Sequence, residues 1–132
     1  MSQELYWLTL TALMTCLFWV PYILNRMAVR GLMGAMANPS SDDAPLSPWA
    51  DRAMAAHRNA VENLVVFAPL ALAVHILNME SALTGWACAV FFFARLAHYL
   101  IYAAGIPVLR TLAFAAGWVV QVILALRLLG VI

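Results

Sequence analysis

The sequence predicts an all-α membrane protein, folded as an up-and-down bundle of four transmembrane helices. Of its 132 residues, 66% are hydrophobic and only 10% are charged, and the mean hydropathy is +0.91. Soluble domains carry about 25% charged residues. The chain also contains four apolar runs, each close to the roughly 20 residues that a helix needs to cross a bilayer. Only one of the connections between these runs is long.

The four predicted spans cover residues 5–25, 55–78, 83–104 and 109–129 of a single domain, 1–132. The first is expected to be retained, because it lacks the basic start of a secretory signal and its apolar run is too long for one. The helix of the second span is expected to begin near Ser47, with Pro48 in its first turn. Pro21 and Pro69 are expected to kink the first and second helices.

The connections predict how the helices are arranged. The long loop, residues 31–50, contains three prolines, two aspartates and three serines, whereas residues 78–82 and 105–107 form short links. Short links make successive helices antiparallel neighbours. Arginines concentrate beside the long loop and the 105–107 link, so these connections are expected to face the cytoplasm and both termini the opposite side.

Composition and spacing argue against several other classes of protein. The formal charge is only +1, so no basic excess is available to neutralise nucleic-acid phosphates. Cys16 and Cys88 form no metal-binding or redox pair and are expected to be small packing residues. The three histidines lie in separate segments without zinc-binding spacing. We therefore expect neither a metal ion nor a nucleic-acid partner, and we expect His75 to be a packing or interhelical hydrogen-bonding residue.

The second span begins with an unusual polar stretch, AHRNAVEN, from residue 56 to residue 63. Arg58 and Glu62 are four residues apart on one helix face, and Asn59 and Asn63 form a second such pair beside them. A single four-helix subunit does not easily shelter this polar face, whereas a neighbouring copy can. The stretch therefore predicts an oligomer in which the second helices line the central axis.

The third span carries a matching stripe in RLAHYLIY, where Arg95, His98 and Tyr102 recur at helical spacing. Ionisable groups inside a membrane cost about 2.5–3.5 kcal/mol each and face protein or a wet cavity. The polar residues of the second and third spans therefore have two interpretations. They are either polar contacts that hold the helices together or a site for an anionic ligand. Four arginines can approach the cytoplasmic half, namely Arg30, Arg58, Arg95 and Arg110, with only Glu62 as a nearby carboxylate. This surplus of cations favours the anion site.

These motifs, together with the NP of AMANPSSDDA, resemble the MAPEG family, the membrane-associated proteins of eicosanoid and glutathione metabolism, in its short bacterial form. The resemblance covers essentially the whole chain. It implies a homotrimer in the bacterial inner membrane, with glutathione bound between neighbouring subunits near the cytoplasmic side. It also implies a glutathione-dependent transferase or peroxidase that acts on lipophilic electrophiles or lipid hydroperoxides.

Matched by motif, the resemblance implies a catalytic role beside the glutathione thiol for Arg110. The predicted glutathione-binding residues combine those that the resemblance implies with the stripe of the third span. They are Arg30, Arg58, Asn59, Glu62, Arg95, His98, Tyr102 and Thr111.

Three positions depart from the family pattern: Ala55 and Ala60 stand where the prostaglandin synthase branch has an arginine and an aspartate, and Phe114 stands where other members have a tyrosine. The departures argue against prostaglandin isomerase activity. They leave open a second function, a noncatalytic membrane protein that binds a lipid or an anionic metabolite in the same cleft.

Overall fold

The computed structural model describes residues 1–132 and contains helices only. Four segments are long and apolar enough to cross a membrane, because the first two helices follow each other as one span. This confirms the predicted all-α bundle of four spans. The helices are α1 (Gln3–Leu17), α2 (Trp19–Met36), α3 (Pro48–Ile76), α4 (Ala82–Ala104) and α5 (Pro107–Leu128).

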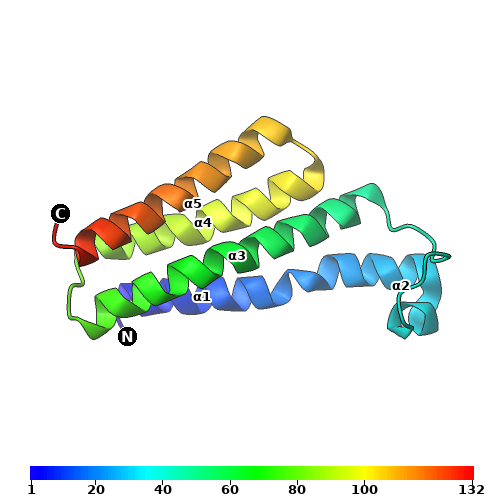
Figure 1. Ribbon diagram of the computed structural model, residues 1–132, viewed down its shortest axis with the longest axis horizontal. Helices are drawn as coiled ribbons and strands as arrows, with labels where there is room; N and C mark the ends of the chain where they lie inside the picture. Colours follow the sequence, from blue (N-terminus) through cyan, green and yellow to red (C-terminus); the bar gives the residue numbers. More distant parts are fainter.

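Successive spans run antiparallel, as the short connections predict (Figure 1). The two termini lie at one end of the bundle with the α3–α4 connection, while the long loop and the α4–α5 turn lie at the other end. Helix α4 packs against α1, α3 and α5, whereas α2 contacts only α1 and α3. Helix α4 has the largest buried share of the four spans, and its buried residues include the polar Thr84, Arg95 and His98.

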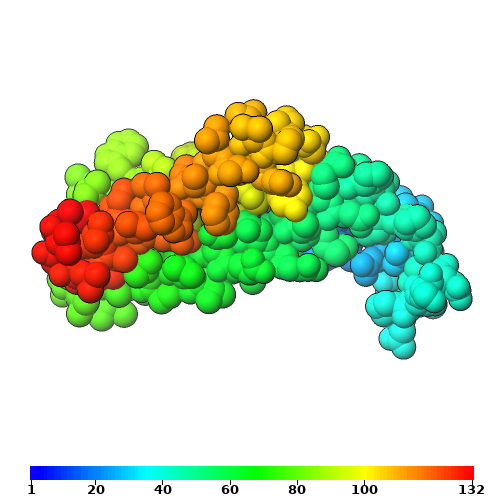
Figure 2. Space-filling model, turned by 45° about the horizontal axis from the view of Figure 1, so that its top comes forward, coloured from blue at the N-terminus to red at the C-terminus, as the bar shows by residue number.

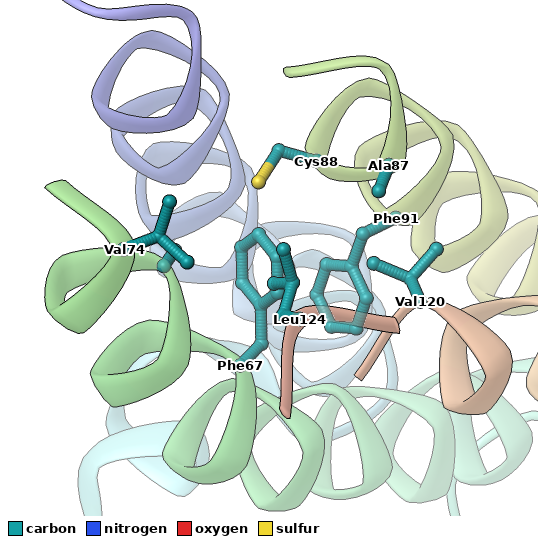
Figure 3. Packing of buried hydrophobic residues seen from close by; sticks show 8 residues of the cluster. Phe67, Val74, Ala87, Cys88, Phe91, Val120 and Leu124 are labelled. Atoms are coloured by element: carbon teal, nitrogen blue, oxygen red, sulfur yellow. The ribbon is translucent and has the colours of Figure 1, made fainter. Parts of the chain in front are cut away.

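The apolar core lies among α3, α4 and α5 (Figure 3). The rings of Phe67 and Phe91 stack there with centroids 3.8 Å apart. Cys88 is fully buried beside them without a disulfide partner, as expected for a small packing residue. Cys16 is exposed, so the packing role expected for it is wrong: its side chain lies on the outer surface of α1.

The first span extends further than the sequence predicts. Helix α2 continues from the expected end near residue 25 to Met36, with a change of direction at Gly31. Gly31 has φ of 73°, a conformation that residues with a side chain rarely adopt. Only residues 37–47 lack helical structure between α2 and α3. In Figure 2 the segment around residue 40 projects from the end of the molecule.

Helix α3, which forms the second span, begins as predicted, with Ser47 as its N-cap and Pro48 in its first turn. It continues through Pro69. In the first span the helix is interrupted at Phe18, within one turn before Pro21. This is the expected place, because a proline ring obstructs the carbonyl four residues earlier and lacks an amide hydrogen. The hydroxyl of Tyr99 donates to the carbonyl of Phe18 at 2.8 Å, and the two rings stack.

Replacing Tyr99 with phenylalanine should lower the free energy of unfolding by about 1 kcal/mol, because the Phe18 carbonyl loses its donor in a buried place. Thermal unfolding in detergent measures this. Tyr6→Phe is the matched control, since the Tyr6 side chain is exposed and its hydroxyl makes no hydrogen bond. Equal melting temperatures for Tyr99→Phe and the parent would show that this bond does not stabilise the helix break.

The end of the bundle that carries the termini is held by acidic residues. Nδ1 of His75 lies 2.6 Å from Oε1 of Glu80 in the α3–α4 connection. His75 was expected to pack or to form a hydrogen bond between helices. It forms a hydrogen bond, but from the last turn of α3 to the α3–α4 connection rather than to another helix. The hydrogen bond from His75 lowers the pKa of Glu80. Glu4 is buried at the same end and accepts a 2.5 Å hydrogen bond from the Thr84 hydroxyl.

The turn between α4 and α5 is held by an arginine from α3. Nε of Arg52 donates to the carbonyl of Ala103 at 3.0 Å. Gly105 then reverses the chain with φ of 81°, and a Cβ at this position would lie only 3.2 Å from the Arg52 guanidinium. The turn fixes how the first residues of α5 face the last turns of α4.

Candidate functional site

An open cleft of about 260 Å³ lies among α3, α4 and α5, near the α4–α5 turn. In Figure 1 the α4–α5 hairpin diverges from α3 toward this end. Five of the residues that line the cleft are among the predicted site residues, and each of the three helices contributes at least one. The lining residues are Asn59 from α3, His98 and Tyr102 from α4, and Arg110, Thr111 and Phe114 from α5.

Helical spacing and the α4–α5 turn bring these side chains together. His98 and Tyr102 are one turn apart on α4, with ring centroids 5.6 Å apart in an edge-to-face arrangement. Arg110 follows Pro107, the first residue of α5, and its guanidinium carbon lies 4.3 Å from the centroid of the Tyr102 ring. This cation–π contact holds the cation at the cleft. The hydroxyl of Thr111 donates back to the carbonyl of Pro107.

Arg95 lies one layer behind the cleft, almost fully buried at 1% exposure. Its Nη2 donates to Oδ1 of Asn59 and lies 3.2 Å from Nδ1 of His98. Its Nε and Nη1 are buried without any hydrogen-bond partner. The ion pairs of the chain join Arg30 to Asp43 and His75 to Glu80, so no carboxylate neutralises Arg95. The cleft is therefore backed by an uncompensated positive charge.

The donor character of Arg95 fixes the polarity of its two neighbours. A guanidinium only donates, so the Asn59 atom that faces it is the carbonyl oxygen and Nδ1 of His98 is an acceptor. The hydrogen of the neutral His98 ring then sits on Nε2. The amide nitrogen of Asn59 has no partner within the chain. With Arg110, these groups give a cleft that offers hydrogen-bond donors and contains no carboxylate, which suits an anionic ligand.

Three other predicted site residues lie apart from the cleft within one chain. Nε of Arg30 donates to the carbonyl of Ala44 at 2.8 Å, and its Nη1 lies 3.5 Å from Asp43, so this arginine holds the long loop. Arg58 and Glu62 share a face of α3, as their spacing predicts, but both are exposed and form no ion pair with each other. That face points away from the bundle.

A residue behind the cleft, which the sequence interpretation missed, contacts the site through hydrogen bonds. Nε2 of Gln121 on α5 donates to both the backbone oxygen and Oδ1 of Asn63, at 3.3 and 3.2 Å. Nδ2 of Asn63 in turn donates to the backbone oxygen and Oδ1 of Asn59, at 2.9 and 3.3 Å. The available signal was Gln121 itself, the one amide side chain of the fourth span, which lies within the apolar run between Thr111 and Arg127.

Comparison with known protein families matches residues 5–130 to the MAPEG family. The match reaches into all four candidate spans and includes every residue that lines the cleft. A comparison with curated proteins found no match. Because the family match covers nearly the whole chain and the fold is a bundle of four apolar spans, this integral multi-pass membrane protein belongs to the MAPEG family.

Proposed function

We propose that this chain is a subunit of a membrane glutathione-dependent transferase or peroxidase that binds glutathione in the cleft beside Arg110. The observation that carries the proposal is the donor-lined cleft, which contains no carboxylate and is backed by the unneutralised Arg95. Glutathione supplies what such a cleft lacks, because it carries two carboxylates and a thiol that becomes an anion. Members of the family to which the chain belongs include glutathione transferases and peroxidases, which supports the same assignment.

Arg110 is the group that activates the thiol in this proposal. A thiol with a pKa of about 8.5 is mostly protonated at neutral pH, and an adjacent cation lowers that pKa because it stabilises the thiolate. The thiol proton leaves to water. The thiolate then forms a sulfur–carbon bond with an electrophile, whose leaving group departs with its electron pair. The Tyr102 ring holds Arg110 in place, so little reorganisation is needed when the charge develops.

The surroundings of Arg110 suit a substrate that partitions into lipid. Its neighbours Val108, Leu109 and Leu112 are exposed and apolar. A lipophilic electrophile or a fatty-acid hydroperoxide that approaches along this surface reaches the cleft without passing through water. We therefore propose hydrophobic compounds as the second substrate.

A neighbouring subunit completes the site in this proposal. The cleft, at about 260 Å³, is open and smaller than the roughly 300–1,000 Å³ of typical ligand pockets. The outer face of α3 presents Arg58 and Glu62 together with the exposed apolar residues Val61, Val65 and Leu72. Charged groups exposed at membrane depth are costly. Packing of these faces in a homotrimer shelters the charges and brings them to the subunit interface.

Alanine substitution of Arg58 or Glu62 tests this assembly. We expect each variant to bind glutathione about tenfold more weakly and to form fewer trimers, because the proposed subunit interface then loses one of the two opposite charges that it brings together. Native mass spectrometry and calorimetric titration in detergent measure the two effects. Asp51→Ala is the control, since Asp51 is exposed in the first turn of the same helix. If both variants assemble and bind as the parent does, α3 does not line the interface.

The orientation proposed for the subunit places the long loop and the α4–α5 turn in the cytoplasm and both termini outside, in a bacterial inner membrane. The arginine distribution supports this orientation, because arginines concentrate in the cytoplasmic connections of membrane proteins and most arginines near the span ends of this chain lie at this end. A cysteine introduced at Ser41 should react with a membrane-impermeant thiol reagent in inverted vesicles but not in intact cells, and the reverse pattern would contradict the orientation. Four arginines, Arg26, Arg30, Arg52 and Arg110, lie toward this end of the spans, and Arg127 lies toward the other.

One observation favours the noncatalytic alternative. Phe114 lines the cleft where a phenol would supply another hydroxyl for catalysis. A membrane protein that only binds an anionic metabolite does not need that hydroxyl. The two functions separate in one assay: the enzyme couples glutathione to an aryl halide or reduces a fatty-acid hydroperoxide, whereas the binder retains glutathione without turnover.

A further inference from the structure

A directed chain of hydrogen bonds runs through the bundle from α5 to the cleft. It starts at Gln121, passes through Asn63 and ends at Asn59. Gln121 and Asn63 are both buried, at 8% and 9% exposure. Gln121 does not line the cleft, so any effect that it has on a ligand must pass through its neighbours.

The direction of this chain is fixed by groups that have only one hydrogen-bonding role. A backbone carbonyl only accepts, so Gln121 must turn its amide nitrogen toward the backbone oxygen of Asn63. Asn63 must likewise turn its nitrogen toward the backbone oxygen of Asn59, which leaves its own oxygen for Gln121. Oδ1 of Asn59 accepts from both Asn63 and Arg95. Only the amide nitrogen of Asn59 is left for the cleft.

We propose that Gln121 is a positioning residue for ligand binding: acting through Asn63, it holds the Asn59 amide so that Nδ2 donates to an anionic group of the ligand. The inference rests on the proposed function, which makes that ligand glutathione. Without Gln121, Oδ1 of Asn63 loses the donor that fixes the side-chain amide. Asn63 then holds the Asn59 side chain less firmly. The cost falls on binding, whereas ionisation of the thiol still depends on Arg110.

The substitution Gln121→Met tests this, because methionine keeps the length of the side chain and removes the donor. We expect the dissociation constant for glutathione to rise about tenfold in the detergent-purified protein, the effect of about one lost hydrogen bond to a charged group. The pH profile of turnover at saturating glutathione should stay that of the parent. Leu124→Val is the control, since Leu124 is a fully buried α5 residue outside the polar chain.

A double-mutant cycle separates positioning from a general loss of packing. In an Asn59→Ala background, Gln121→Met should cause no further loss of affinity, while Leu124→Val should have the same small effect in both backgrounds. If Gln121→Met fails to assemble, Asn63→Ala interrupts the same chain from α3 and should give the same non-additive result.

The outcomes distinguish this inference from the function on which it rests. If the parent protein binds no glutathione, both the proposed function and the positioning role of Gln121 are wrong. A parent that binds glutathione, with Gln121→Met and Asn63→Ala binding equally well, overturns the positioning role alone. Additive losses in the Asn59→Ala background also overturn it, because they show that Gln121 contributes through bundle stability rather than through Asn59.

Discussion

Replacing Arg110 with glutamine is expected to reduce glutathione-dependent turnover about tenfold at neutral pH, with a loss that shrinks as the pH rises. A neighbouring cation lowers a thiol pKa by roughly 1–3 units. This raises the thiolate fraction at pH 7 by more than it lowers the reactivity of each thiolate. Above the pKa of the free thiol, about 8.5, the thiol ionises unaided. The variant should therefore approach the parent in alkaline solution.

Turnover with an aryl halide, followed from pH 6 to pH 9 in detergent, measures this effect. Arg110→Lys keeps a cation and should keep much of the parent pH profile. Arg127→Gln removes an arginine near the other end of α5 and should leave the profile unchanged. Identical pH profiles for Arg110→Gln and the parent would remove Arg110 from the mechanism and leave it as a binding or packing residue.

Replacing Arg95 with methionine is expected to weaken glutathione binding about thirtyfold while changing the stability of the ligand-free protein by less than about 1 kcal/mol. Removing Arg95 takes a donor from Asn59 and from His98, which is unfavourable. It also removes a buried guanidinium that has two unpartnered nitrogens and no carboxylate, which is favourable. The two effects on stability oppose each other, but both reduce the attraction of the cleft for an anion.

Calorimetric titration and thermal unfolding of the same preparation measure both quantities. Arg95→Lys should lie between the parent and Arg95→Met in affinity, because lysine keeps the charge but not the contacts with both Asn59 and His98. If Arg95 only holds the helices together, the result is the opposite. Arg95→Met then loses about 3–5 kcal/mol of stability, as when one partner of a buried pair is removed, and its affinity for glutathione, measured on the folded fraction, stays that of the parent.

The fold follows closely from features that a single sequence displays. Apolar run length and short links predict the spans and their antiparallel order, and the Ser47–Pro48 pair predicts where α3 begins. The end of the first span was misplaced, because Arg26 and Arg30 interrupt its hydropathy although the helix continues through both. A helix that leaves the apolar layer keeps its backbone hydrogen bonds, and the sequence there shows no break before Gly31.

The site was predictable where it depends on one helix. Helical spacing places Arg95, His98 and Tyr102 on one stripe of α4, and all three lie at or behind the cleft. Spacing also gives Arg58 and Glu62 a common face, but it does not determine whether that face points into the bundle or away from it.

Contacts between helices far apart in the chain could not be predicted. The link from Gln121 to Asn63 joins residues 58 positions apart, and no local pattern marks either as the partner of the other. The loop contacts of Arg30 with Ala44 and Asp43 likewise join residues 13 and 14 positions apart, across the change of direction at Gly31. Such contacts require knowledge of how the helices pack.

The central claim is that the cleft stabilises the thiolate of bound glutathione, and ultraviolet titration of the thiolate in the bound parent protein tests it most directly. We expect the absorbance of bound glutathione to report a thiol pKa at least one unit below the roughly 8.5 of a free thiol. S-methylglutathione, which cannot ionise at sulfur, provides the baseline. Bound glutathione whose thiol titrates at the value of the free tripeptide would contradict the claim and identify the cleft as a binding site without catalytic function.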